Sequence, residues 1–458
     1  MTALTNTEAH YKRMTETPVS KLITVLGIPT TVSMLITNIY NLADTYFVGT
    51  LGASQQAATG ILFTLQAIIQ AIAFMLGHGS GTFVAKELAD RNPRKADTYV
   101  STSFFVGAAA GTLLAVLGLC FLKPFMRLLG STETILPYAC DYGMWVLLSA
   151  PFMVCSLVLN NNLRYESKTL CAMVGLTTGG IINIFGDYLL IRVFDMGVYG
   201  AGLATAVSQT ISCILLVVFY KRYAQSKIRI GAISHDISVY CWIIRVGFPS
   251  LIRQGLSSIA NGLLNNLTKP FGDAAIAAMS VVNRFGSLVM CVGLGIGQGF
   301  QPVSSFNYQA KVYSRVKKGL LFTMALGTVL VGIQSVAALC FAEKIVWFFQ
   351  KSEEVIAVGA PAMRFAAVGF LFFPVAMPVN MLYQSIRKPE ISSLLSLMRS
   401  GLAFIPTLIV TVHFFGLLGI QISQPIADIL TGLISIPFTI HFLHTAPSDG
   451  TAANKGSS

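Results

Sequence analysis

Residues 22–48 carry the sequence LITVLGIPTTVSMLITNIYNLADTYFV, in which no charged side chain precedes Asp44. A helix of roughly 20 apolar residues is enough to cross the hydrocarbon core of a bilayer, and this run is longer. In lipid the backbone must satisfy its hydrogen bonds within the segment, so a helix is the expected structure. The stretch therefore predicts a membrane-spanning helix that contains both a proline and an acid.

Eleven further apolar runs follow. The 458 residues are 54% hydrophobic and only 11% charged, whereas soluble domains carry roughly a quarter charged residues. This composition excludes an ordinary soluble protein and leaves little chain for a separate soluble domain. The twelve expected spans lie at about 22–48, 55–80, 98–122, 134–158, 168–192, 198–220, 239–267, 273–300, 318–342, 355–382, 391–413 and 416–443.

The loop charges predict the orientation of the chain. Of the 31 Lys and Arg residues, twenty lie in loops on the side of the N-terminus, six in loops on the opposite side and five within spans. Positive loops face the cytoplasm, so we expect a multi-pass protein of the cell (inner) membrane with both termini cytoplasmic. Residues 1–20 show no cleavable signal, and residues 444–458 are expected to form a disordered tail. The eight cysteines make no CxxC motif, so no disulfide framework or zinc site is indicated.

Short motifs recur at an offset of about 220 residues. Gly27-Ile28-Pro29 matches Gly247-Phe248-Pro249, and Gly77-x-Gly79 matches Gly297-x-Gly299. Because each repeat would hold six spans, both enter the bilayer in the same direction, and an axis along the membrane normal should relate them. We therefore predict an all-α polytopic membrane protein of twelve transmembrane helices in two six-helix lobes with this pseudo-two-fold relation. The N-lobe would be 21–221, a cytoplasmic linker 222–238 and the C-lobe 239–443.

Ionisable residues inside a membrane are costly and mark functional sites by default. Asp44 lies in the first span, and Asn183 and Asp187 lie on one face of the fifth, four residues apart. Thr205 enters from the outside on the sixth span and reaches a similar depth after about two turns. These side chains, with a carbonyl near Ala201, could converge in the N-lobe as a cation-coupling site.

The chemistry of this group fits two ions. Oxygen ligands suit a hard cation, so Na⁺ could bind at Asp44, Asn183 and Asp187, and a shared proton suits the two acids equally well. In the second repeat Leu264 and Pro406 occupy the positions of the acids, so the scaffold does not require the pair. The competing interpretation is structural: Asp44 would reach to the interface, and Asn183 and Asp187 would cap or pair.

The interiors of the spans in the second half contain five arginines and one acid, Asp428. Asp428 and Arg399 lie at similar depth on neighbouring expected helices, which favours a structural ion pair. Three arginines, Arg253, Arg284 and Arg364, have no obvious partner in the sequence and could line a water-filled cavity. Tyr40 and Asn41 are further candidates for the cavity lining.

Several motifs have a simpler structural interpretation. Pro29 is a kink or hinge site in the first span. Gly77-His78-Gly79-Ser80-Gly81 resembles a phosphate loop only loosely, and close helix packing explains its glycines better. The sequence contains no Walker, HExxH or GxSxG motif, so we expect no enzyme, and the energy for any transport would come from an ion gradient.

Taken together, five motifs resemble those of the multidrug and toxic compound extrusion (MATE) family, in particular its DinF/MepA-like bacterial branch. The resemblance covers about residues 20–440. The matching pieces are Asn41-Leu42-Ala43-Asp44-Thr45, Asn161-Asn162-Leu163-Arg164, Asn183-x-x-x-Asp187, Gly200-Ala201-Gly202-Leu203-Ala204-Thr205 and Gly297-Gln298-Gly299-Phe300-Gln301-Pro302.

The resemblance implies two six-helix lobes and alternating access, with export of cationic amphipathic compounds in exchange for H⁺ or Na⁺. It implies that Pro29 bends the first helix. It also implies a cation site in the N-lobe, at the positions of Asp44, Asn183, Asp187, Thr205 and the backbone of Ala201. We expect a monomer in the lipid bilayer that binds small substrates, no nucleic acid and no cofactor besides the coupling ion.

A second hypothesis remains open. A flippase or exporter of lipid-linked or polysaccharide precursors would use similar lobes, and a cavity rich in arginine would suit anionic headgroups. A membrane enzyme or channel is disfavoured, because catalytic motifs are missing and a two-lobed repeat favours alternating access over a fixed pore.

Overall fold

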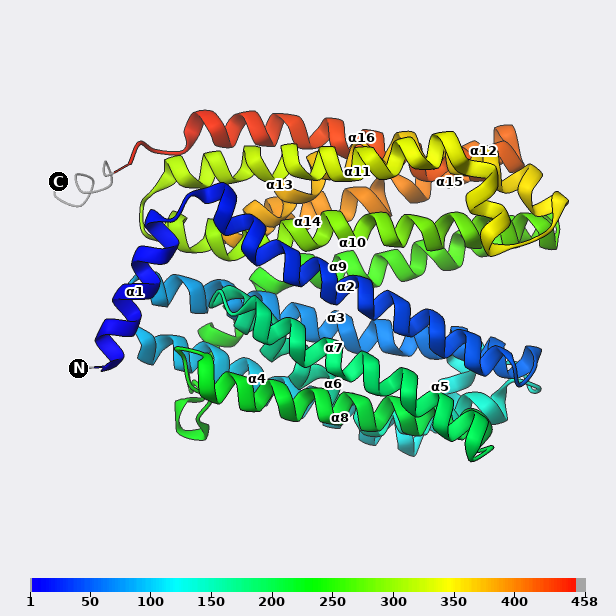
Figure 1. Ribbon diagram of the computed structural model, residues 1–458, viewed down its shortest axis with the longest axis horizontal. Helices are drawn as coiled ribbons and strands as arrows, with labels where there is room; N and C mark the ends of the chain where they lie inside the picture. Colours follow the sequence, from blue (N-terminus) through cyan, green and yellow to red (C-terminus); the bar gives the residue numbers. More distant parts are fainter. Residues whose placement is uncertain (1, 450–458) are drawn as a thin grey trace. The chain divides into compact units, whose positions relative to one another are not determined.

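The computed structural model describes residues 2–449, and within this range all regular secondary structure is helical (Figure 1). The first half contains α1 (Thr2–Glu16), α2 (Val19–Gly49), α3 (Ala53–Ala89), α4 (Pro93–Cys120), α5 (Leu122–Leu128), α6 (Leu136–Tyr165), α7 (Thr169–Asp187), the π-helix η1 (Tyr188–Val193) and α8 (Gly197–Tyr223). The second half contains η2 (Ile230–Ala232), α9 (Ile237–Thr268), η3 (Lys269–Phe271), α10 (Asp273–Gln309), α11 (Tyr313–Phe349), α12 (Glu353–Phe370), α13 (Phe373–Ser385), α14 (Pro389–Leu397), the π-helix η4 (Met398–Leu402), α15 (Phe404–Phe415) and α16 (Leu417–Thr445).

Ten helices of the described chain are long and apolar enough to cross a membrane. The pair α12 and α13 adds an eleventh span that is bent by 46°. The twelfth expected span corresponds to α9, which at 32 residues is long enough but holds several polar and charged side chains. The expected all-α, multi-span architecture is therefore confirmed, and the span expected at 355–382 is broken at Leu371 and Phe372.

The helices group into two compact units. The N-unit comprises Val32–Gln254, and the C-unit comprises the described residues up to Thr31 and from Gly255 onward. This division differs from the expected lobes 21–221 and 239–443 at the two opening helices. The first part of α2 belongs to the C-unit, and the first part of α9 belongs to the N-unit.

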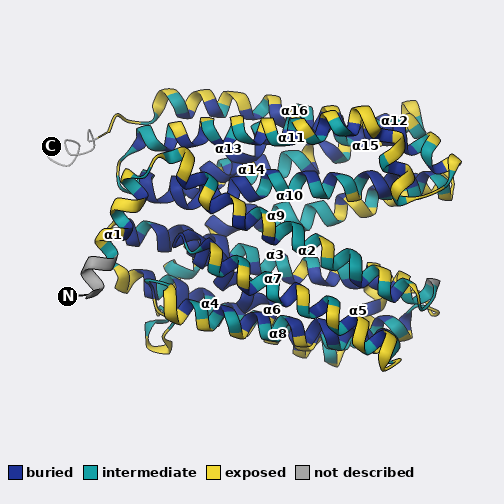
Figure 2. Cartoon of the chain, viewed as in Figure 1, coloured by how far each residue is buried: buried dark blue, intermediate teal, exposed yellow. Residues whose placement is uncertain are grey.

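Each unit has its own apolar core (Figure 2). In the N-unit, α6 contacts α3, α4 and α8, and Ile243 from the first part of α9 joins this core. In the C-unit, α10 contacts α11, α12 and α13, while α16 contacts α12 and α15. The core of the N-unit includes Tyr142 and Ala201, so packing of this core fixes the helices that carry the polar residues described below.

Facing glycines explain why the opening helices change partners. A Cβ atom at Gly79 would lie 2.0 Å from the carbonyl oxygen of Ile243, and one at Gly247 would lie 1.8 Å from that of Met75. In the C-unit, a Cβ at Gly299 would lie 2.5 Å from the Cα of Gly27. Only glycine permits such approaches, so each repeat carries one crossing of the same kind.

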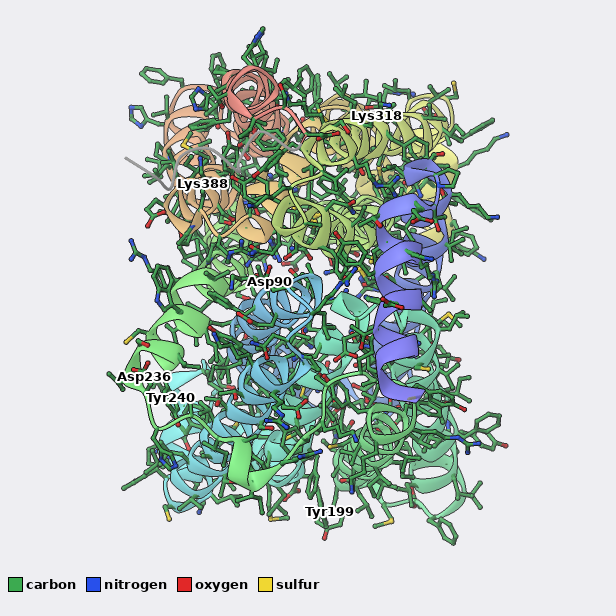
Figure 3. All side chains as sticks on the ribbon, turned by 90° about the vertical axis from the view of Figure 1, so that its left-hand side faces the viewer. Asp90, Tyr199, Asp236, Tyr240, Lys318 and Lys388 are labelled. Atoms are coloured by element: carbon green, nitrogen blue, oxygen red, sulfur yellow. The ribbon has the colours of Figure 1, made fainter. Side chains whose placement is uncertain are left out.

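The segment expected as a linker is attached to the N-unit. The backbone N–H of Lys227 donates to Asp97 at 2.6 Å, and that of Ser234 donates to the Thr102 hydroxyl at 3.0 Å. The buried carboxylate of Glu166 accepts hydrogen bonds from the Tyr220 hydroxyl at 2.8 Å and from the backbone N–H of Gln225. Figure 3 is viewed from the left-hand side of Figure 1, and it labels Asp236, directly before α9, and Tyr240 in the first turn of α9.

The terminal segments are attached to the C-unit. Asn307 donates to the carbonyl oxygen of Met14 at the end of α1 at 3.1 Å, and Arg315 donates to the carbonyls of Met14 and Thr17. At the other end, α16 continues to Thr445, and Asp449 accepts from the backbone N–H of Ser314 at 2.9 Å. Residues 450–458, which belong to the tail predicted to be disordered, lie outside the described residues.

Candidate functional site

Three helices of the N-unit carry the residues of the predicted ion site. Asp44 lies near the end of α2, Asn183 and Asp187 lie on α7, and Ala201 and Thr205 lie on α8. All five are buried, with exposed fractions between 0% and 6%. The structure therefore places none of them at the surface, and the interpretation of Asp44 as an interfacial side chain does not hold.

A hydrogen-bonded chain joins three of these residues through Tyr142 of α6. The Tyr142 hydroxyl lies 2.8 Å from Oδ2 of Asp44 and 3.2 Å from Oγ1 of Thr205, and Nδ2 of Asn183 lies 3.3 Å from the same Thr205 oxygen. With Asp44 ionised, the direction of each bond is fixed. Asn183 donates to Thr205, Thr205 donates to Tyr142, and Tyr142 donates to Asp44.

The hydrogen bonds among these four side chains use every donor hydrogen except the second amide hydrogen of Asn183. Several acceptor oxygens of the site remain without a donor. Oδ1 of Asp44, Oδ1 of Asn183 and both carboxylate oxygens of Asp187 are buried and have no hydrogen-bond partner among the described residues. Asp44 and Asp187 also interact electrostatically as like charges. A buried acceptor without a donor is unfavourable, so these four oxygens favour a bound cation or an added proton.

Such an oxygen set fits a hard cation, because carboxylate and amide oxygens are the ligands that such ions prefer. Within residues 2–449, no group of three or more His, Cys, Asp or Glu side chains could hold a metal ion. The acids of this site number two, and its other oxygens come from an amide and hydroxyls. The donor set is thus compatible with Na⁺ or a proton and lacks the soft ligands of a transition-metal site.

Two features of the site were missed by the sequence analysis. Tyr142 has no motif to announce it, although a tyrosine within an apolar run is a group that needs a hydrogen-bond partner when buried. Asp187 lies where α7 passes into the π-helix Tyr188–Val193. Short π segments inside α-helices occur frequently at functional sites, but no sequence signal predicts this one.

The remaining predicted residues lie in varied surroundings. Tyr40 packs on Gly180 of α7, where an added Cβ would meet its ring at 2.9 Å, and Asn41 is half-buried on α2. Pro29 lies within α2, two residues before the contacts of this helix pass from the C-unit to the N-unit. Arg253 is half-buried in the N-unit and Arg284 is exposed in the C-unit, so they belong to different units.

The intramembrane arginines of the C-unit find acidic partners in two cases. Nε of Arg399 lies 2.9 Å from Oδ1 of Asp428, which confirms the predicted ion pair. The sequence showed no obvious partner for Arg364, and the structure supplies one: its Nη2 lies 2.9 Å from Oε1 of Glu343. Beyond the non-helical residue Phe341, α11 continues to Phe349 and carries Glu343, which lies one residue past the span expected at 318–342.

The chain is similar in sequence to known multidrug export proteins. The chain is 23% identical over 424 residues to the multidrug export protein MepA of Staphylococcus aureus (strain MSSA476), covering 92% of this chain and 93% of that protein. It is 22% identical over 412 residues to MepA of Staphylococcus saprophyticus, covering 90% and 91%.

Solved structures agree with the fold. A crystal structure of a MATE protein in complex with MaL6 superposes with a TM-score of 0.89 at 24% identity, covering 94% of this chain and 98% of that one. An outward-facing structure of a multidrug resistance MATE family transporter of the MOP superfamily superposes with a TM-score of 0.88 at 24% identity, covering 94% of this chain and 98% of that one. The sequence model of the MatE family matches residues 29–189 and again residues 249–409, which confirms the internal repeat. The chain belongs to the MatE family.

Proposed function

We propose that this protein is a secondary active multidrug exporter that exchanges cationic amphipathic compounds for H⁺ or Na⁺ by alternating access. It would act in the inner membrane with both termini in the cytoplasm. The family, and the similarity to multidrug export proteins of the MepA type, support transport of small molecules. The observation that carries ion coupling is the set of four buried acceptor oxygens at Asp44, Asn183 and Asp187.

The coupling follows from differential binding. The site is most stable with a cation or proton bound, because an empty site leaves two buried acids that interact as like charges and whose oxygens lack donors. An ion that favours one conformation and a substrate that favours the other then drive each other through the cycle. Thr205 and Tyr142 hold Asp44 in place, and Ala201 lies one turn before Thr205 on α8.

One observation favours a second candidate function, the export of lipid-linked or polysaccharide precursors. Arg284 lies within the membrane-spanning helix α10, is exposed, and its guanidinium has no acidic partner among the described residues. Charged side chains within spans face a cavity rather than lipid. A cationic cavity wall would suit an anionic headgroup.

Vesicles containing the purified protein and a cationic dye test the proposal. A pH gradient and a Na⁺ gradient are imposed separately, and we expect one of them to drive dye movement. Asp187→Asn and Asp44→Asn should abolish this movement. Asp141→Asn is the matched control, because Asp141 is an exposed acid next to Tyr142 on the same helix, and it should transport like the parent.

Two results would contradict the proposal. Full gradient-driven transport in both Asp187→Asn and Asp44→Asn would show that the acids do not couple. Dye movement under neither gradient, with movement of an anionic lipid-linked compound instead, would favour the second candidate.

A further inference from the structure

A charged cluster of the C-unit lies around Arg399, outside the proposed ion site. Arg399 belongs to the π-helix η4, ten residues after the start of the span Pro389–Phe415, so it lies roughly 15 Å into the membrane. Its side chain is 17% exposed, and that of its partner Asp428 on α16 is 2% exposed. Charged side chains at such a depth face the interior of a helix bundle or a water-filled cavity rather than lipid.

Asp428 holds the guanidinium of Arg399 at one edge. Oδ1 of Asp428 accepts hydrogen bonds from Nε of Arg399 at 2.9 Å and from Nε2 of Gln424, one turn earlier on α16, at 3.1 Å. Among the described residues, neither Nη1 nor Nη2 of Arg399 donates to this carboxylate. Asp428 therefore fixes the orientation of the guanidinium through Nε and leaves the fork formed by Nη1 and Nη2 directed elsewhere.

The fork has few acceptors in the protein. Nη2 lies 3.5 Å from Sδ of Met290 on α10, and a thioether sulfur is only a weak acceptor. Nη1 has no hydrogen-bond partner among the described residues. A buried ion pair is favourable only where further hydrogen bonds satisfy its remaining protons, so a purely structural pair does not account for this fork. The two nitrogens of such a fork match two oxygens of a carboxylate or phosphate.

A small apolar cluster, separate from the main core of the C-unit, lies beside the guanidinium. It consists of side chains from α10 and α13: Met290, Leu294, Phe373, Met377 and Met381. The guanidinium carbon of Arg399 is 4.9 Å from the centre of the Phe373 ring. An added Cβ at Gly293 would lie 2.5 Å from Cε1 of Phe373, so α10 holds this ring closely. Methionine side chains adapt to ligands of different shape, and this cluster is therefore suited to an apolar body attached to the anionic group.

The first repeat shows that the scaffold does not require this charge. At the offset of 220 residues, Arg399 corresponds to Gly179. An added Cβ at Gly179 would lie 2.9 Å from Cβ of Ser212 on α8, so the corresponding helix of the N-unit packs closely without a charged residue. Each repeat has a charged side chain at a π segment of this helix, Asp187 directly before η1 and Arg399 within η4. Such segments occur frequently at functional sites.

We propose that Arg399 and the apolar cluster form a binding site for an amphipathic compound that carries a carboxylate or phosphate group. The fork of Arg399 binds two oxygens of this group, Asp428 positions the fork, and the apolar body lies against Phe373 and Met290. A cationic headgroup would meet the guanidinium as a like charge, so this site differs in ligand from the acids of the N-unit. The proposal goes beyond cation exchange and, because it concerns binding, it does not depend on the proposed function.

Three probes that share one naphthalene ring test the site: 2-naphthoate, 2-naphthyl phosphate and the uncharged 2-naphthamide. Their binding to the full chain in non-ionic detergent micelles is measured by equilibrium dialysis, and micelles without protein correct for partition. We expect the better of the two anions to bind about tenfold more tightly than 2-naphthamide, because a hydrogen bond to a charged group contributes this much. Displacement of the anion by added phosphatidylglycerol would identify a lipid phosphate as the ligand, and retention would identify a small amphipathic anion.

Arg399→Lys is the decisive variant, because lysine keeps the positive charge beside Asp428 but has no planar fork. It should weaken binding of the preferred anion by about tenfold and leave that of 2-naphthamide unchanged, and its unfolding transition in the same micelles shows that it is folded. Phe373→Leu should weaken all three probes alike, because it removes the aromatic face. Arg127→Lys is the matched control and should bind like the parent, since Arg127 forms an exposed ion pair with Glu133 at 2.9 Å.

Two results would overturn the site: binding of 2-naphthamide as tight as that of both anions, or undiminished binding of the preferred anion to Arg399→Lys. Dye transport by the same preparations in vesicles separates this test from that of the proposed function. A parent that transports dye under an ion gradient but binds neither anion would refute the anion site alone. A parent that binds the anion but moves dye under neither gradient would refute the exporter alone.

Discussion

Replacement of Gly247 by alanine tests the helix crossing on which residues 237–254 depend. The new Cβ would lie 1.8 Å from the carbonyl oxygen of Met75, whereas ordinary contacts begin near 3.4 Å, so α9 must withdraw by about 1.6 Å. Overpacking of this kind costs about 1–3 kcal/mol. The gain in helix propensity of about 0.5–1 kcal/mol works in the opposite direction.

Gly255→Ala is the matched control on the same helix, since no atom lies within 4 Å of its added Cβ. Both variants gain the same helix propensity, so their difference isolates the clash. We expect the free energy of unfolding of Gly247→Ala to be lower than that of Gly255→Ala by about 1–3 kcal/mol. Denaturation of the purified protein in mixed micelles measures this difference.

The distance between two spin labels in lipid nanodiscs provides a second readout of the same variants. One label is on the exposed Cys241 of α9, after the other seven cysteines are replaced by alanine, and the other is on Arg94→Cys at the exposed start of α4 in the same unit. Gly247→Ala should lengthen this distance, and Gly255→Ala should leave it unchanged. Equal stabilities and equal distances in the two variants would show that the close approach of α9 and α3 is not a feature of the folded protein.

Three further predictions concern hydrogen bonds and ion pairs. Tyr142→Phe removes the donor to Asp44, a bond to a charged group worth about 1.5–3 kcal/mol, so gradient-driven dye transport should fall by roughly tenfold or more; unchanged transport would exclude Tyr142 from the site. Arg399→Met should lower the free energy of unfolding by about 3–5 kcal/mol, because it leaves Asp428 buried without its partner, and Arg399→Met combined with Asp428→Leu should recover much of the loss in the same assay. Burial raises the pKa of Glu166 above its ordinary value, and its hydrogen bonds oppose this only in part. Its contribution to stability is therefore complete below the pKa of the unfolded chain and is lost as pH rises through the raised pKa; Glu166→Gln should remove this component of the pH dependence, and an unchanged stability profile would contradict it.

The candidate site could be predicted from the sequence only in part. Asp44, Asn183 and Asp187 are polar residues in apolar runs, and the spacing of four puts the last two on one helix face. Tyr142 could not be found this way, because tyrosines also occur within spans as packing residues and at both interfaces. Its role depends on α6 lying beside α2 and α8, which helix periodicity does not encode.

The partners of the arginines show the same division. Arg399 and Asp428 were paired correctly, because both lie at similar depth on helices that are neighbours in the chain. The pair of Arg364 and Glu343 was missed, because the end of α11 is helical beyond the apolar run and brings an acid into reach. A hydropathy boundary marks the end of an apolar run, and a helix need not end there.

The sequence by itself determined that the chain crosses a membrane repeatedly, that it consists of two similar halves, and that one half alone carries the pair of acids Asp44 and Asp187. These properties follow from the transfer cost of side chains and from direct comparison of residues, and both are local. The tertiary structure decided which helix supplies the hydroxyl to Asp44, where each opening helix changes partners, and which ring and which sulfur contact Arg399. These contacts depend on backbones that approach at glycines far apart in the chain, and such distances exist only once the helices have packed.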